Sequence, residues 1–231
     1  MKMADSSFSF HLDVIDRAIV AAVRAAVEDI MPDIMNDYDL RERNGFAQFR
    51  WNVIISRLRD QCQHLGWFDL GICSRGGWKT PVLFHPTSRN IITLMTEDTF
   101  SHVQHRKDKG KHYLCGGSSF NKNVEAQYEQ LELHLPGISP DTEQWIAKSR
   151  EDLAHSIHVS VGEIDGHILV LFDTRADHLL SVRAVRLTHD LAISTEEEDW
   201  SKYIKMPYDT DQTVLPHYNI EEDEENLVEL L

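Results

Sequence analysis

The chain has 231 residues, of which 42% are hydrophobic and 9% aromatic. It can therefore bury a sizeable core, and its composition is not that of an intrinsically disordered protein. No apolar run approaches the ~20 residues that span a bilayer, and the most apolar segment, residues 18–27, contains Arg24, which argues against a signal peptide. Cys62, Cys73 and Cys115 are odd in number and far apart, which indicates reduced thiols and predicts a soluble, cytoplasmic protein.

The net charge of −15 is unevenly distributed along the chain. Residues 41–122 carry 13 Lys and Arg against 6 Asp and Glu, a net charge of +7. The remaining residues carry 10 against 32, a net charge of −22. A uniformly acidic protein repels phosphate, whereas a basic middle can bind a polyanion locally. The basic segment can also pair with the acidic segments, or its charges can be spread over solvated faces.

The N-terminal part of the chain predicts two helices. Between residues 9 and 31 apolar side chains recur at spacings of three and four, which favours an amphipathic helix, and Pro32 marks its expected end. Residues 33–45 are expected to be a connector. A second apolar stripe predicts a helix over 45–64, with Gly66 at its end.

Three strands are expected next. Residues 67–74 and 78–86 are short apolar runs separated by Arg-Gly-Gly, which is a hairpin signal. Residues 90–96 form a third apolar run and predict a third strand.

A short helix and a loop follow the third expected strand. The helix is predicted over 97–106, because Thr96 can cap it and two acidic residues occupy its first turn. Residues 107–123 are rich in Gly, Lys, Ser and Asn, so we expect a loop with at most a short strand at 112–115.

The second half of the chain predicts helix and then strand. Residues 125–157 are expected to form two helical pieces, the second starting near Pro140. Three apolar runs predict strands at 157–164, 167–174 and 179–187. An Asp-Gly turn at 165–166 is expected to join the first two strands. Residues 195–231 are acidic and are expected to be irregular.

These elements predict an α+β fold with antiparallel sheet and the N-terminal helices packed on one face. Short turns between strands favour antiparallel pairing. We expect a single domain over 1–218, with a sub-boundary near 122–140 as an alternative. Residues 219–231 are expected to be an acidic C-terminal tail.

Residues 101–117 gather histidine, cysteine and four cations in one stretch. His102, His105, His112 and Cys115 are residue types that bind zinc. The cations between them oppose a divalent ion, so we expect no bound metal and no other cofactor. These cations are Arg106, Lys107, Lys109 and Lys111.

A second interpretation of this stretch is a phosphate-binding surface, in which the same cations contact the phosphate groups. Gly116 and Gly117 allow a close backbone approach, and neighbouring hydroxyl and amide groups add neutral donors. The expected hairpin adds a tryptophan beside two cations, which suits a base or a sugar. The candidate ligand-binding residues are Arg75, Trp78, Lys79, Arg106, Lys107, Lys109, Lys111, Ser118 and Asn121.

Three functions fit these observations. The first is a binding or regulatory protein whose basic surface over 41–122 contacts nucleic acid or another polyanion and whose acidic tail tunes the contact. The second is a metal-independent ribonuclease, for which His102, His105 and His112 are the candidate catalytic residues. The third is an adaptor that binds protein only, through the first helix and the tail aliphatics, with a homodimer as one form of such contact. Those aliphatics are Leu227, Val228, Leu230 and Leu231.

Overall fold

The computed structural model describes residues 9–12, 14–39, 45–66, 68–75, 78–122, 124 and 140–205. Its helical segments are α1 (Ile15–Arg24), the π-helical η1 (Ala25–Ile30), α2 (Met31–Asp37), α3 (Phe46–Leu65), α4 (Glu97–His105), η2 (Lys109–Lys111), α5 (Tyr113–Ser118), α6 (Pro140–Ser156), η3 (Val161–Glu163) and η4 (Ser201–Tyr203). Its strands are β1 (Asp69–Arg75), β2 (Trp78–His85), β3 (Asn90–Thr96), β4 (Gly166–Arg175), β5 (His178–Leu187) and β6 (Ile193–Asp199). Within these residues, no helix combines the length and the apolar character that a membrane crossing requires.

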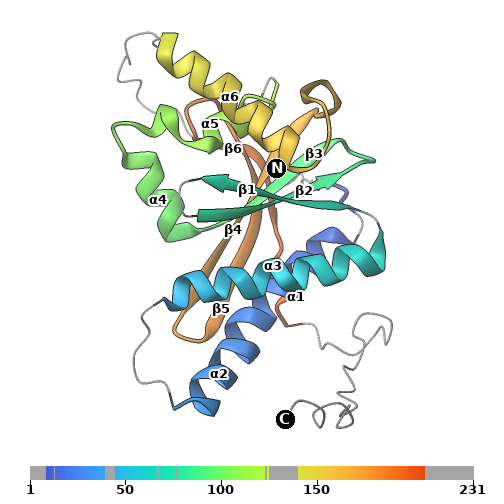
Figure 1. The fold of residues 1–231 in the computed structure, drawn as a ribbon, viewed down its shortest axis with the longest axis vertical. Coiled ribbons are helices and arrows are strands. Elements are labelled where there is room, and N and C mark those ends of the chain that lie inside the picture. Colours follow the sequence, from blue (N-terminus) through green and yellow to red (C-terminus); the bar gives the residue numbers. More distant parts are fainter. Residues whose placement is uncertain are drawn as a thin grey trace, which may run out of the picture.

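The six strands form one sheet in the order β1-β2-β3-β4-β5-β6. Neighbouring strands are antiparallel within β1–β3 and within β4–β6. The two units join through β3 and β4, which run parallel from the pair Asn90↔Gly166 to the pair Thr96↔Phe172. Parallel neighbours need a long crossover connection, and α4, α5 and α6 lie on it (Figure 1).

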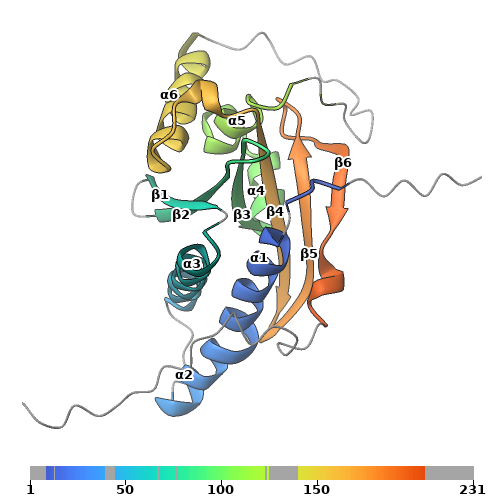
Figure 2. The ribbon, with the colours of Figure 1, turned by 90° about the vertical axis from the view of Figure 1, so that its right-hand side faces the viewer.

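Helices cover both faces of the sheet. In β3, Ile92 and Leu94 belong to a buried cluster with α1 and α3, whereas Ile91 and Met95 belong to a second cluster with α4, α5 and α6. Successive side chains of a strand point to opposite faces, so this alternation assigns one cluster to each face. The β1–β2 hairpin lies between α3 and α6 in both views (Figure 1 and Figure 2).

The predicted α+β class is confirmed, with a mostly antiparallel sheet and the N-terminal helices on one face. The sequence did not predict the parallel β3–β4 pair or the second helical layer. These two strands lie on either side of the sub-boundary considered at 122–140, and one continuous sheet joins them. The tail predicted at 219–231 and the helical piece predicted at 125–139 lie outside the described residues.

The first helix differs from the prediction at its end. The sequence predicts a stop at Pro32, but helical backbone continues through η1 and α2 to Asp37, so the expected connector starts later. Pro32 lies at the start of α2, directly after the π-helical segment. Helical backbone precedes Pro32, so the proline removes one backbone hydrogen bond from a continuous helix, and the wider π-helical turn directly before it is where the helix accommodates that loss.

Residues 107–123 are not the predicted loop. They contain η2 and α5, and α5 includes both Gly116 and Gly117. A Cβ atom at Gly116 would clash with Ser149 of α6, and one at Gly117 would lie 2.7 Å from Nδ1 of His167. The two glycines therefore permit close packing of a helix rather than marking a flexible loop.

Two predictions for the last part of the chain are wrong. Residues 157–164 are not a strand but contain η3, in which Ser160 and Glu163 form a reciprocal capping box. The strand β6 instead occupies 193–199, which overlaps a segment expected to be irregular. β6 is an edge strand with consecutive acidic residues, and charged side chains on an edge discourage pairing with another chain.

Candidate ligand-binding site

Strands β2 and β3 separate at Pro81. β2 pairs with β1 from Trp78 onward but pairs with β3 only from Val82 onward. Proline has no N–H to donate and cannot continue a ladder on the side where that donor is needed. The first half of β2 therefore diverges from the part of β3 that follows Thr93.

A pocket of about 260 Å³ lies at this divergence. It is formed by side chains from α3, β2, β3 and α4 and by the start of α5. The lining residues are Trp51, Trp78, Lys79, Thr80, Pro81, Leu94, Met95, Thr99, His112 and Tyr113.

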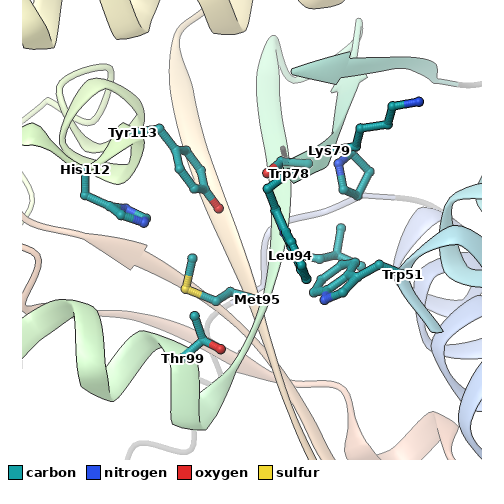
Figure 3. Close-up of a pocket in the computed structure, with 10 residues that line it drawn as sticks. Trp51, Trp78, Lys79, Leu94, Met95, Thr99, His112 and Tyr113 are labelled. Atoms are coloured by element: carbon teal, nitrogen blue, oxygen red, sulfur yellow. The ribbon is translucent and has the colours of Figure 1, made fainter. Parts of the chain in front are cut away.

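Aromatic rings stand on opposite sides of the pocket. In Figure 3, Tyr113 and His112 lie on one side of the space. Trp78 and Trp51 lie on the other side, with Met95 between the two pairs. The hydroxyl group of Tyr113 points toward the middle of the pocket, whereas the ammonium group of Lys79 points outward. The arrangement offers flat apolar surfaces inside and a cation at the rim.

The rings are held by the elements that carry them. His112 is the N-cap of α5, where its Nδ1 accepts a hydrogen bond of 3.3 Å from the backbone N–H of Leu114. Its ring lies 4.7 Å from the ring of Tyr113, centroid to centroid. On the opposite wall, Trp51 packs edge-on against Phe172 of β4, with 5.7 Å between the centroids of the two rings. These contacts fix the two walls from both faces of the sheet.

The predicted basic loop is only partly available to a ligand. Arg106 forms an ion pair of 2.7 Å with Asp108, and this hydrogen bond raises the pKa of Arg106 and lowers the pKa of Asp108. Lys109 donates to the carbonyl oxygen of Asp190 at 3.3 Å. The side chains of Lys107 and Lys111 are exposed.

Two predicted phosphate contacts are buried inside the fold. Ser118 is fully buried, and its hydroxyl donates to the carbonyl oxygen of Cys115. The amide of Asn121 bridges two strands, because its Nδ2 donates to the carbonyl of Leu187 and its Oδ1 accepts from the backbone N–H of His167. Neither side chain reaches a surface in this structure, so the structure does not support them as ligand contacts.

The three candidate catalytic histidines do not share one site. His102 and His105 are exposed on α4, where each Nδ1 lies 2.7 Å from a carbonyl oxygen of the same helix, Asp98 and Ser101 respectively. His112 lines the pocket, and the other two do not. Acid–base cleavage of RNA needs two such groups at one substrate, so this geometry gives the ribonuclease interpretation no support.

Cys115 is not arranged as a reactive or metal-binding thiol. Its Sγ lies 3.2 Å from the carbonyl oxygen of Lys109, and burial raises its pKa to about 11. A thiol must lose its proton to act as a nucleophile or as a metal ligand. Across the described residues, no three or more His, Cys, Asp or Glu side chains are grouped in a way that could hold a metal ion.

Comparison with known proteins identifies the family to which this chain belongs. Residues 8–230 match the model of a family of unknown function, DUF5986. The chain belongs to the DUF5986 family. Searches of curated proteins and of solved structures found no match to the chain.

In this DUF5986 chain, the fold brings together candidates from two separate parts of the basic segment. Trp78 and Lys79 come from the β1–β2 hairpin and His112 from the stretch 101–117, and all three line one pocket. Arg75 ends β1 opposite Trp78 in the register.

Three lining aromatic or flexible residues were missed as site candidates, namely Trp51, Tyr113 and Met95. Trp51 lies among the apolar residues of the helix predicted over 45–64, a pattern that favours a core position. Trp51 lines the pocket at the point where β2 diverges from β3. The local sequence around Trp51 carries no signal for this divergence.

Proposed function

We propose that this protein binds nucleic acid or another polyanion through the pocket and the cations around it, and that the acidic tail tunes this contact. The observation that carries the proposal is the convergence of Trp78, Lys79 and His112 on one pocket. A cation at the rim of an aromatic pocket suits a phosphate next to a base or a sugar. The three free cysteines suit a reducing compartment such as the cytoplasm.

The charge around the pocket supports the same function despite the acidic chain. Lys79 is exposed at the rim. Lys107 and Lys111 are exposed on the segment that runs from α4 to His112. A local group of cations attracts phosphate even where the net charge of the protein is negative, because screening at physiological salt limits the reach of distant charges to about 8 Å.

The experiment is fluorescence anisotropy with a labelled oligonucleotide over a series of salt concentrations. Lys79→Ala is expected to weaken binding and to reduce the slope of log K against log salt concentration by about 0.7–0.9, the value of one phosphate contact. Lys205→Ala is the matched control, since Lys205 is also exposed but follows η4, which comes after β6, the strand at the opposite edge of the sheet. It should leave affinity and slope unchanged.

Two results would contradict this proposal. The first is wild-type protein without measurable affinity for RNA, DNA or heparin at low salt. The second is an equal loss of affinity in the Lys79 and Lys205 variants, because that would make overall charge, and not the pocket rim, the determinant of binding.

A further inference from the structure

We infer that the pocket receives one unstacked nucleobase of a single-stranded nucleic acid, with the adjoining phosphate at Lys79. This inference rests on the proposed nucleic-acid binding and names the form of ligand that the pocket selects. It follows from three properties of the pocket: its facing aromatic walls, its size and the charge of its lining.

The facing walls suit a flat ring. Tyr113 and His112 oppose Trp78 and Trp51 across the space (Figure 3). Every nucleobase has two π-faces that stack on aromatic side chains with little dependence on sequence. A base between these walls has its faces covered by protein, so its neighbours in the strand cannot cover them at the same time. The pocket therefore requires a base that has left its stack.

The floor and the size of the pocket limit what can enter. Leu94 and Met95 line the pocket and are almost fully buried, at 2% and 6% exposed, so this part of the lining is apolar and closed to solvent. Its volume of about 260 Å³ is below the ~300–1,000 Å³ typical of drug-sized ligands. A single ring system suits this space, whereas the sugar and the phosphate remain at the rim. Bases in a duplex are paired as well as stacked, so a single strand presents such a base at lower cost.

The charge of the lining distinguishes a nucleotide from a cationic ligand. Aromatic pockets also bind quaternary ammonium groups, which carboxylates nearby would favour. The ten described lining residues include Lys79 and His112 and no Asp or Glu. In Figure 3 the ammonium group of Lys79 points away from the space between the rings, and we assign the backbone phosphate to this ammonium group. The lining thus favours an anionic ligand with an uncharged ring.

The same features favour a strand over a free nucleotide. One exposed cation holds a single phosphate weakly, because water screens the attraction. Lys107 and Lys111 are exposed on the segment that leads to His112 and offer further cations beyond the pocket. A strand can contact several of these cations at once, whereas a mononucleotide reaches the rim alone.

The test measures binding of four probes at one salt concentration. They are a labelled single-stranded oligonucleotide, the same oligonucleotide without bases, the corresponding duplex, and a nucleoside monophosphate as competitor. We expect the single strand to bind more tightly than the duplex and the abasic strand. The monophosphate should compete only at much higher concentration.

Tryptophan variants locate the base. Trp78→Ala should reduce affinity for the single strand by ~10-fold or more, the usual effect of losing a stacking partner, and should hardly change affinity for the abasic strand. Trp78→Phe should retain most of the affinity. Trp145→Ala is the matched control, because Trp145 on α6 is 42% exposed, close to the 45% of Trp78, and does not line the pocket. It should bind like the wild type.

Several outcomes would overturn the inference while leaving the proposed function intact. One is binding that depends on Lys79 and salt but is equal for the single, duplex and abasic forms. Another is equal loss of affinity in the Trp78 and Trp145 variants. A monophosphate that competes as well as the strand would make the ligand a free nucleotide. The probe comparison uses unaltered protein, so it decides the question even where a variant fails to fold.

Discussion

At the scale of a single residue, the buried imidazole of His167 links the stability of the fold to pH. His167 is fully buried on β4, and its Nε2 lies 2.8 Å from the hydroxyl oxygen of Thr93. Its Nδ1 is buried without a hydrogen-bond partner in the described residues. Burial, together with the smaller effect of the charge on Arg186, lowers its pKa to about 3. The folded protein therefore keeps this ring neutral.

The sign of the pH dependence follows from the lowered pKa. In the unfolded chain His167 binds a proton below pH ~6.5, whereas in the folded chain it does so only near pH 3. The stabilising effect is complete above pH ~6.5 and is lost as the pH falls toward 3, at up to about 1.4 kcal/mol of unfolding free energy per pH unit. Denaturant titrations from pH 7 to pH 4 should give a shallower pH dependence for His167→Gln than for the wild type. Parallel curves for the two proteins would contradict this account.

At the scale of the elements, α6 depends on a glycine in β1. A Cβ atom at Gly71 would overlap the carbonyl oxygen of Ser156, at the end of α6, and would also lie 2.9 Å from a side-chain carbon of Ile157. The neighbour is backbone and cannot rotate away. The helix can therefore approach the sheet this closely only while residue 71 has no side chain.

Gly71→Ala is expected to destabilise the protein by about 1–3 kcal/mol, the cost of forcing an extra carbon into a packed site. The measurement is the midpoint of chemical denaturation. Gly162→Ala serves as control, because a Cβ atom at that position meets no atom within 4 Å. A Gly71 variant as stable as the Gly162 variant would mean that α6 packs less closely than the structure indicates.

At the scale of the whole molecule, the distribution of charge leads to the prediction that the acidic tail competes for the proposed binding surface. Residues 41–122 carry a net charge of +7, whereas Glu221 to Glu225 are five consecutive acids near the C-terminus. A tethered acidic segment competes with nucleic acid at an effective concentration that is commonly millimolar. The four aliphatics that follow the acids could anchor it, since each is worth roughly 1.5–3 kcal/mol if fully buried.

Deletion of residues 219–231 is expected to raise nucleic-acid affinity several-fold, and most strongly at low salt. Replacement of Leu227, Val228, Leu230 and Leu231 by Ser, with the acids kept, should reproduce much of that gain. Anisotropy titrations of the full chain and the two variants give the comparison. Identical affinities across the salt series would show that the tail does not compete for the binding surface.

The sequence by itself determined the elements whose signals are local. Thr96 caps α4 by accepting from the backbone N–H of Thr99, and Gly66 ends α3 with a φ of 62°. The spacing of the apolar residues predicted α3 and the strands β1 to β5. This signal is local, because the burial of one or both faces of a helix or strand determines which of its neighbouring residues are apolar. Trp78, Lys79 and His112 were proposed as candidates from the side-chain types in two short stretches, the expected hairpin and residues 101–117.

Tertiary structure decided the features that join distant residues. The same glycines that indicate a loop in the sequence permit α5 to pack on α6 and on β4, and only the fold supplies Ser149 and His167 as their neighbours. The parallel pairing of β3 with β4 depends on a crossover whose path no local pattern encodes. The pocket brings Trp51 of α3 to the same space as Tyr113 of α5. Such contacts depend on strand pairing and helix packing over long separations, which short-range propensities do not determine.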